Sequence, residues 1–334
     1  MQSILRIFIA TVIVITLSSA QYSLTVERIG GAKRFGEENI FRAALVNNGR
    51  TINTIEQKLP FDVPFPATYI NETTGNFILS YIFDGFVEVY NAKGEKIWKQ
   101  NFFKEMGPNY ERTITVALGT SSVAFLTSDV ALPNAVAHRF TLDGAKQWET
   151  LLPYSMGYEI AMSPDEQTIV AGSYFVLEDE VRQSASLINT KGLIEGNANI
   201  LFRKAAFSDD NAKLEESFGH PSDKFIALAS EREIVIVLNE TKKEFSRAGK
   251  QTEGIITDII WHGKNLIVQE SNVITPKNGR FYYSNPTFIS YSKELKEISK
   301  KQLDNVTFKS STMKKVGATI ELIYERKSIR ILDK

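Results

Sequence analysis

The sequence lacks cysteine altogether and has only three histidines among 334 residues. A chain without cysteine forms no disulfide, holds no iron–sulfur cluster, uses no thiol nucleophile and carries no lipid on an N-terminal cysteine. The histidines, His138, His220 and His262, lie far apart and show none of the short spacings of metal-binding motifs. We therefore expect neither a metal nor a cofactor.

Net charge is also missing, because 39 basic residues balance 39 acidic residues. A balanced charge gives no electrostatic attraction to nucleic acid or to an anionic membrane. The sequence contains no G-x-S-x-G, P-loop or G-x-G-x-x-G motif, which argues against an α/β-hydrolase and against a nucleotide-binding fold. A hydrophobic content of 43% is enough for a large packed core.

Long apolar runs are absent except at the N-terminus, where residues 7–17 follow Arg6 and precede two serines and Ala20. This run is shorter than the roughly 20 residues that span a membrane, and its flanks are typical of a secretory signal peptide. We predict a signal peptide over residues 1–20 and one domain over residues 21–334, with no membrane span after cleavage. Export without disulfides is more typical of bacteria, so we expect the periplasm or the exterior of a bacterial cell.

A hairpin pattern recurs along the whole chain. Polar turns rich in Asn, Asp and Gly lie between β-type runs near residues 49, 94, 144, 192, 240 and 294, and a last run stops near 333. Two further β-type runs precede most of these hairpins, which makes four strands per unit. Residues 294–302 could form a helix by composition, but they fall where a fourth strand belongs. Units of 40 to 50 residues with several short strands are typical of β-propellers.

We therefore predict an all-β fold, a β-propeller of four-stranded antiparallel blades. Seven blades are favoured, and six are the alternative because the first unit is one strand short. We expect residues 22–27 to pair with the C-terminal blade, since this would close the ring and cover exposed strand edges.

Two short patterns resemble the repeats of known propeller families. Residues 161–170, AMSPDEQTIV, resemble the Ser-Pro-Asp-Gly turn of WD40-like propellers. The segments GEKIW (94–98) and GAKQW (144–148) resemble the Gly-Lys-x-x-Trp turn of quinoprotein-like (PQQ-repeat) propellers. The resemblance covers residues 22–334 as a pattern only, and it implies that Trp98 and Trp148 dock each blade on its neighbour.

The tryptophan is not repeated in the other units. The equivalent regions carry Ile55, Ile194, Phe245 and Ile298. This argues against a regular quinoprotein enzyme and leaves a divergent propeller, whose fold alone does not define a function.

The connections expected at one rim of the propeller are longer than those at the other, and they carry aromatic and acidic residues. Exposed aromatics on loops held by a rigid scaffold are typical of binding faces. The alternative is that these aromatics fill the central channel or cover blade edges. The candidate partner-binding residues are Phe65, Tyr110, Tyr154, Glu178, Asp179, Phe281, Tyr282 and Tyr283.

The function that fits these observations is a non-enzymatic scaffold that binds a protein or a glycan of the cell envelope or exterior. One alternative is a hydrolase or lyase with a polar site in the central channel, which ionisable groups with shifted pKa values would indicate. A second alternative is a structural subunit of a surface assembly.

Overall fold

The computed structural model describes residues 22–29, 34, 36–61, 63–103, 112–129, 132–178, 180–208, 224–239, 247–274, 282–316, 318–325 and 327–332. All regular structure in these residues is β-strand, and residues 297–302 form a strand rather than a helix. Within the same residues there is no helix of the length and apolar character that a membrane crossing requires. Residues 1–20, the predicted signal peptide, lie outside the described residues.

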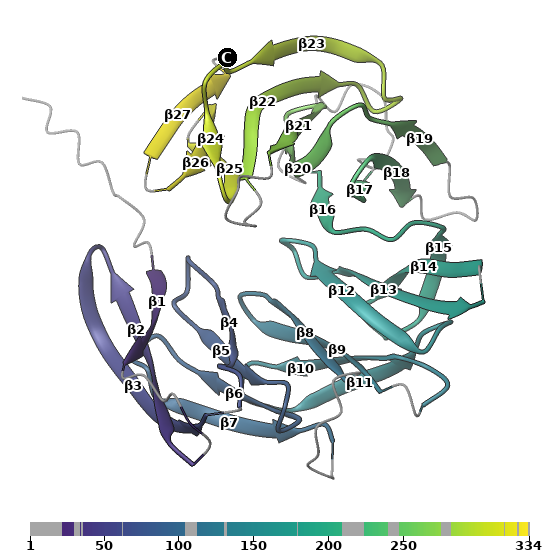
Figure 1. Ribbon diagram of the computed structural model, residues 1–334. Coiled ribbons are helices and arrows are strands. Elements are labelled where there is room, and N and C mark those ends of the chain that lie inside the picture. The colour runs from purple at the N-terminus through teal and green to yellow at the C-terminus, as the bar shows by residue number, and fades with distance from the viewer. Residues whose placement is uncertain are drawn as a thin grey trace, which may run out of the picture. The chain divides into compact units, whose positions relative to one another are not determined.

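The strands form seven sheets in which neighbours along the chain are paired (Figure 1). The first sheet has three strands, β1 (Tyr22–Ile29), β2 (Glu38–Asn47) and β3 (Arg50–Pro60). The second has β4 (Ala67–Ile70), β5 (Phe77–Tyr81), β6 (Phe86–Tyr90) and β7 (Lys96–Asn101), and the third has β8 (Thr113–Leu118), β9 (Ser122–Ser128), β10 (Val136–Thr141) and β11 (Lys146–Leu151). The fourth contains β12 (Met156–Met162), β13 (Thr168–Leu177), β14 (Glu180–Asn189) and β15 (Ile194–Ala198).

The remaining three sheets continue the same order. The fifth has β16 (Lys204–Phe207), β17 (Lys224–Ala229), β18 (Glu233–Asn239) and β19 (Arg247–Gln251). The sixth has β20 (Ile255–His262), β21 (Asn265–Ile274), β22 (Tyr282–Tyr291) and β23 (Glu297–Gln302), and the short β24 (Thr307–Phe308) also pairs with β22. The seventh has β25 (Ser311–Val316), β26 (Thr319–Tyr324) and β27 (Lys327–Leu332).

Turn chemistry explains where the last hairpin of a sheet folds back. Gly94, Gly144 and Gly192 occupy the turns before β7, β11 and β15, and their φ angles are 76°, 95° and 79°. This left-handed conformation is open to glycine at little cost, so these residues fix the turns that the sequence predicts.

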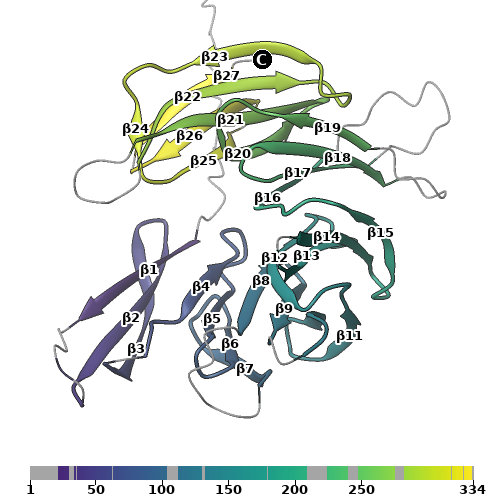
Figure 2. The same cartoon turned by 45° about the vertical axis from the view of Figure 1, so that its right-hand side comes forward.

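By internal contacts the chain divides into two compact units, one of residues 1–79 and 88–97 and the other of residues 80–87 and 98–334. In the first unit, the fully buried Phe41 packs edge-to-face on Phe65, with ring centroids 5.4 Å apart. In the second unit, the core lies between successive sheets, which stack face to face (Figure 2). Leu126 and Ile160 belong to one such layer, and Phe288 and Leu322 to another.

The predicted pairing of residues 22–27 with the C-terminal strands is wrong. β1 pairs with β2 in a continuous register that runs from Tyr22 opposite Asn47 to Ile29 opposite Ile40. A strand pairs more readily with its sequence neighbour than with the far end of the chain, because the shorter loop loses less entropy on closure. β1 is thus an edge strand of the three-stranded first sheet.

Candidate functional site

The residues predicted to bind a partner do not form one cluster. Phe65 is packed on the core residue Phe41, and Tyr154 is half-buried in the connection between β11 and β12. Tyr282 and Tyr283 lie side by side in β22, and Tyr283 stacks on the buried Phe308 with ring centroids 5.8 Å apart. Three further predicted residues lie outside the described residues: Tyr110, Asp179 and Phe281.

Glu178 is different, because it is exposed at the turn of a long hairpin. β13 and β14 pair over ten residues, from Thr168 opposite Asn189 to Leu177 opposite Glu180. On one side β12 pairs with β13 only as far as Tyr174, and on the other side β15 pairs with β14 only from Ala185 onwards. Beyond these points the two strands pair only with each other in the described part of the chain (Figure 1).

The end of this hairpin is apolar and exposed. The exposed fractions of Phe175, Val176, Leu177 and Val181 are 40%, 53%, 52% and 54%. Because side chains alternate along a strand, Val176 and Val181 share one face of the ribbon, and Phe175 and Leu177 share the other. Sequence reasoning missed these four residues. The available signal was the run of four aromatic and aliphatic residues from Tyr174 to Leu177, directly before the acidic turn.

The β21–β22 hairpin extends in a similar way but is more covered. Val273 and Ile274 are each 44% exposed, opposite Tyr283 and Tyr282. There, β24 pairs with β22 at Tyr283 and occupies that edge. The β13–β14 end is therefore the more open of the two apolar hairpin ends.

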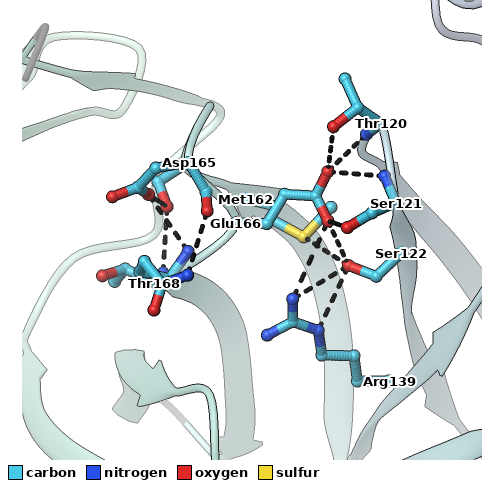
Figure 3. Close-up of polar contacts among 10 residues, drawn as sticks. Thr120, Ser121, Ser122, Arg139, Met162, Asp165, Glu166 and Thr168 are labelled. Carbon is cyan, nitrogen blue, oxygen red and sulfur yellow. Dashed lines mark hydrogen bonds and ion pairs between the residues drawn. The ribbon is translucent and has the colours of Figure 1, made fainter. Parts of the chain in front are cut away.

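The densest polar cluster in Figure 3 surrounds Glu166, in the turn between β12 and β13. Ser163 and Asp165 build this turn, since the Ser163 hydroxyl donates to Asp165 at 2.6 Å and accepts the Thr168 N–H at 3.0 Å. Glu166 stands where the WD40-like pattern has glycine, and its φ is 58°. A left-handed conformation is costly for glutamate, so other contacts must compensate.

The compensation comes from the turn between β8 and β9. The Glu166 carboxylate accepts five hydrogen bonds, from the N–H and hydroxyl groups of Thr120 and Ser121 and from the Ser122 hydroxyl (Figure 3). Arg139 donates to the Ser122 oxygen at 3.0 Å and lies 3.9 Å from the Glu166 carboxylate. Burial alone would raise the pKa of Glu166, but the bonds from Ser122, Thr120 and Ser121 outweigh it and lower the pKa to about 2.

This arrangement is a contact between two sheets and not a ligand-binding site. A Cβ at Gly119 would lie 2.6 Å from the Glu166 carboxyl carbon, so the backbone of the β8–β9 turn approaches the carboxylate closely. The carboxylate is ionised and surrounded by donors, which leaves it little capacity to bind or transfer a proton. We read it as a structural contact between the third and fourth sheets.

A second set of charged groups lies on the first strands of the fourth, fifth and sixth sheets. Glu159 and Asp258 each follow a β-bulge, in β12 and β20, and Lys204 begins β16. The Lys204 amine is 4.0 Å from the Asp258 carboxylate, which also accepts the N–H groups of Ile259 and Met313 at 3.0 and 2.7 Å.

Both carboxyl groups are perturbed in the same direction. Burial raises the pKa of Asp258, against the opposing effects of Lys204 and the two N–H donors. Burial likewise raises the pKa of Glu159, against the Ile160 N–H and Lys204. These are the shifted ionisable groups that an enzymatic site would need. No group of three possible metal ligands occurs among the residues that the structure describes.

Trp98 and Trp148 both lie over the glycine turn of the following sheet. The Trp98 ring contacts the position where a Cβ of Gly144 would stand, at 3.0 Å, and its indole N–H donates to the Leu142 carbonyl at 2.8 Å. The Trp148 ring lies in the same way over Gly192, at 2.9 Å. Its indole N–H finds no hydrogen-bond partner among the described residues.

Comparison with known proteins gives a fold but no family. No protein-family model matches the sequence, and no curated protein matches it. A chain in the crystal structure of the mitotic checkpoint complex matches this structure with a TM-score of 0.53 at 9% identity, over 98% of both chains. A chain of hydrazine synthase from Kuenenia stuttgartiensis matches with a TM-score of 0.48 at 9% identity, over 89% of this chain and 92% of that chain.

A protein of unknown function from Bacteroides caccae matches with a TM-score of 0.41 at 11% identity, over 85% of this chain and 94% of that chain. The first likeness supports a shared fold and nothing about function, and the other two are too distant to support a conclusion. The likeness to the chain of the mitotic checkpoint complex, together with seven successive antiparallel sheets, places this chain in the β-propeller class.

Proposed function

We propose that this protein is an exported, seven-bladed β-propeller that binds another protein through the end of the β13–β14 hairpin. The observation that carries the proposal is the exposure of Phe175, Val176, Leu177 and Val181 on the two faces of one hairpin end. Apolar side chains gathered on a surface are typical of protein-binding sites, whereas isolated ones are common everywhere.

The chemistry of the hairpin end narrows the partner. These four apolar side chains offer no hydrogen bond to sugar hydroxyls, so a protein fits this surface better than a glycan. Glu178 and Glu180 border the apolar residues, and among the described residues Glu180 forms an ion pair with Arg182 at 3.2 Å while Glu178 forms none. A complementary partner surface is apolar at its centre and basic at its margin.

Two further parts of the proposal rest on the sequence. Residues 1–20 have the features of a signal peptide, so the partner is a protein of the envelope or of the exterior. The turns that end in Trp98 and Trp148 support a divergent relation to WD40-like or quinoprotein-like propellers.

The test compares the hairpin end with a more exposed apolar side chain elsewhere. The tagged protein captures partners from the envelope fraction of the cells that express it, and bound proteins are quantified by mass spectrometry. We expect Phe175→Ser with Leu177→Ser to lose at least about tenfold of the specific partner, since apolar anchors dominate such interfaces. Leu151→Ser, at a residue that is 66% exposed on β11, is the control and should bind normally. Equal capture by both variants would refute the proposal.

An enzyme is the second candidate, and the specific observation in its favour is that the half-buried Glu159 and the buried Asp258 both have raised pKa values and both interact with Lys204. A raised pKa favours the protonated form of a carboxyl group, which is the form that a general acid of a hydrolase or lyase needs. In a screen of hydrolase and lyase substrates, any activity of the wild type should be abolished by Asp258→Asn. An activity that survives this change at full rate does not come from this site.

A further inference from the structure

We propose that two copies of this chain join through the outer edge of β14, as an antiparallel strand pair centred on Val181. The inference concerns the same hairpin as the proposed function, but it concerns the backbone edge rather than the apolar faces. Between Glu180 and Ser184, no described strand pairs with this edge. An open strand edge is a template for another strand.

The direction of the peptide groups on this edge follows from the register. The Asn189 N–H points towards β15, because it donates to the Leu193 carbonyl at 3.0 Å. The β13–β14 pairing shows no register shift, so peptide groups alternate regularly along β14. Val181 and Gln183 therefore direct their N–H and C=O groups to the side where β15 has ended.

The sequence of this edge is complementary to itself. β14 begins Glu180-Val181-Arg182. In an antiparallel pair centred on Val181, each Glu180 lies directly opposite Arg182 of the other copy, and the two Val181 residues lie opposite each other. Opposite charges placed across a strand pair stabilise it, and like charges destabilise it. A register centred on Arg182 would instead oppose two arginines.

Dimer formation requires only that Glu180 and Arg182 change ion-pair partners. Glu180 and Arg182 already form an ion pair within one strand, at 3.2 Å, with side chains that are 61% and 54% exposed. In the dimer these groups change partners and leave no charge unpaired. The edge carries no proline, lysine or described bulge, which are among the devices that block strand addition, and its charges at Glu180 and Arg182 are complementary across the pair. An isologous two-fold contact of this kind is the commonest arrangement of homodimers.

The absence of cysteine makes a direct test of the register possible. Val181→Cys introduces the single thiol of the chain, and in the proposed dimer the two Cα atoms at this position are about 5.5 Å apart, within disulfide range. We expect this variant to form a covalent dimer under mild oxidation. Val176→Cys is the matched control: Val176 lies opposite Val181 in the same hairpin and is equally exposed, but in the dimer the two copies of position 176 are separated by two intervening strands. It should remain monomeric on the same gel.

Analytical ultracentrifugation tests the charge pairing without any cross-link. We expect Arg182→Glu to raise the dissociation constant of the dimer about tenfold, and the double variant Glu180→Arg with Arg182→Glu to restore it. Equal cross-linking at positions 176 and 181, or no effect of Arg182→Glu on the dissociation constant, would overturn the proposal. Phe175→Ser with Leu177→Ser should still cross-link through Val181→Cys, so loss of partner capture and loss of the dimer are separate outcomes.

Discussion

At the scale of single residues, Glu166 combines an unfavourable backbone conformation with a highly favourable set of hydrogen bonds. The sequence pattern marks its position as one for glycine, and a left-handed φ of 58° agrees with that reading. What the pattern does not contain is the distant β8–β9 turn, whose donors hold the carboxylate. A residue that departs from a turn pattern in this way indicates that its side chain has a partner elsewhere.

Replacing Glu166 with glutamine should lower the free energy of unfolding by about 3 kcal/mol at pH 7, because an amide cannot accept all five bonds and places an NH₂ group among donors. The pKa of Glu166 lies below its ordinary value of 4.5, so its stabilisation is complete above pH 4.5 and is lost as the pH falls towards 2. Urea unfolding at pH 7 and pH 3 should show the difference between variant and wild type shrinking. Glu178→Gln, at an exposed turn position, is the control and should behave as wild type at both pH values.

His138 should give a separate dependence on pH. Burial, helped by Lys146, lowers its pKa from 6.5 to about 4 despite Glu149. Between pH 6.5 and pH 4, His138 is therefore protonated in the unfolded chain but not in the folded chain. The free energy of unfolding falls as the pH falls through this range. We expect this histidine to account for about 2–3 kcal/mol of the loss. Urea unfolding between pH 7 and pH 4.5 should give a flatter profile for His138→Gln than for the wild type, and parallel profiles would contradict the assignment.

At the scale of elements, the contact between a fourth strand and the next turn can be dissected at Trp98 and Gly144. Trp98→Ala should cost about 3 kcal/mol of unfolding free energy, because it removes a packed ring and a hydrogen bond. Gly144→Ala should also destabilise, since it combines a left-handed φ of 95° with a close approach to the ring. In the Trp98→Ala background only the backbone cost should remain. A double-mutant cycle by urea unfolding measures this coupling, and strict additivity would mean that the ring and the glycine do not interact.

Element boundaries show where local reasoning stops. The glycine and asparagine turns are predicted correctly because turn chemistry is local to a few residues. The extension of β13 to Leu177 is not predicted, because a strand continues as long as its partner does and Glu178 could equally begin a loop. In the first unit the sequence places Ile55 at the tryptophan position, whereas the structure has Asn53 there. The β2–β3 and β10–β11 hairpins carry the same register shift, so Asn53, four residues after Gly49, corresponds to Trp148, four residues after Gly144.

At the scale of the whole molecule, the prediction of an all-β chain of successive antiparallel sheets is confirmed, and seven sheets agree better with seven blades than with six. This much follows from the sequence because strand periodicity and turn spacing repeat along the chain. The pairing of β1 does not follow, since any apolar strand can complete more than one sheet edge.

The candidate site was predictable only in part, for a related reason. The sequence indicates that Glu178 lies in an acidic turn, but the exposure of Val176 and Val181 depends on where β12 and β15 end. Whether an apolar residue is buried is decided by its neighbours in space. Phe65 illustrates the opposite outcome, because it packs on the buried ring of Phe41 and is itself half-buried.

The last strand of several sheets donates a side-chain hydrogen bond to the backbone of the following sheet. Four side chains donate to a main-chain carbonyl of the next sheet along the chain. These bonds run from Asn53 to Lys93, from Trp98 to Leu142, from Thr150 to Gly192 and from Lys301 to Ile331. An amide, an indole, a hydroxyl and an amine thus perform one task. Since the acceptor is a backbone carbonyl, side chains of different chemical types can make the same contact. Relatives of this protein are therefore to be sought by the recurrence of that contact in three dimensions rather than by shared letters.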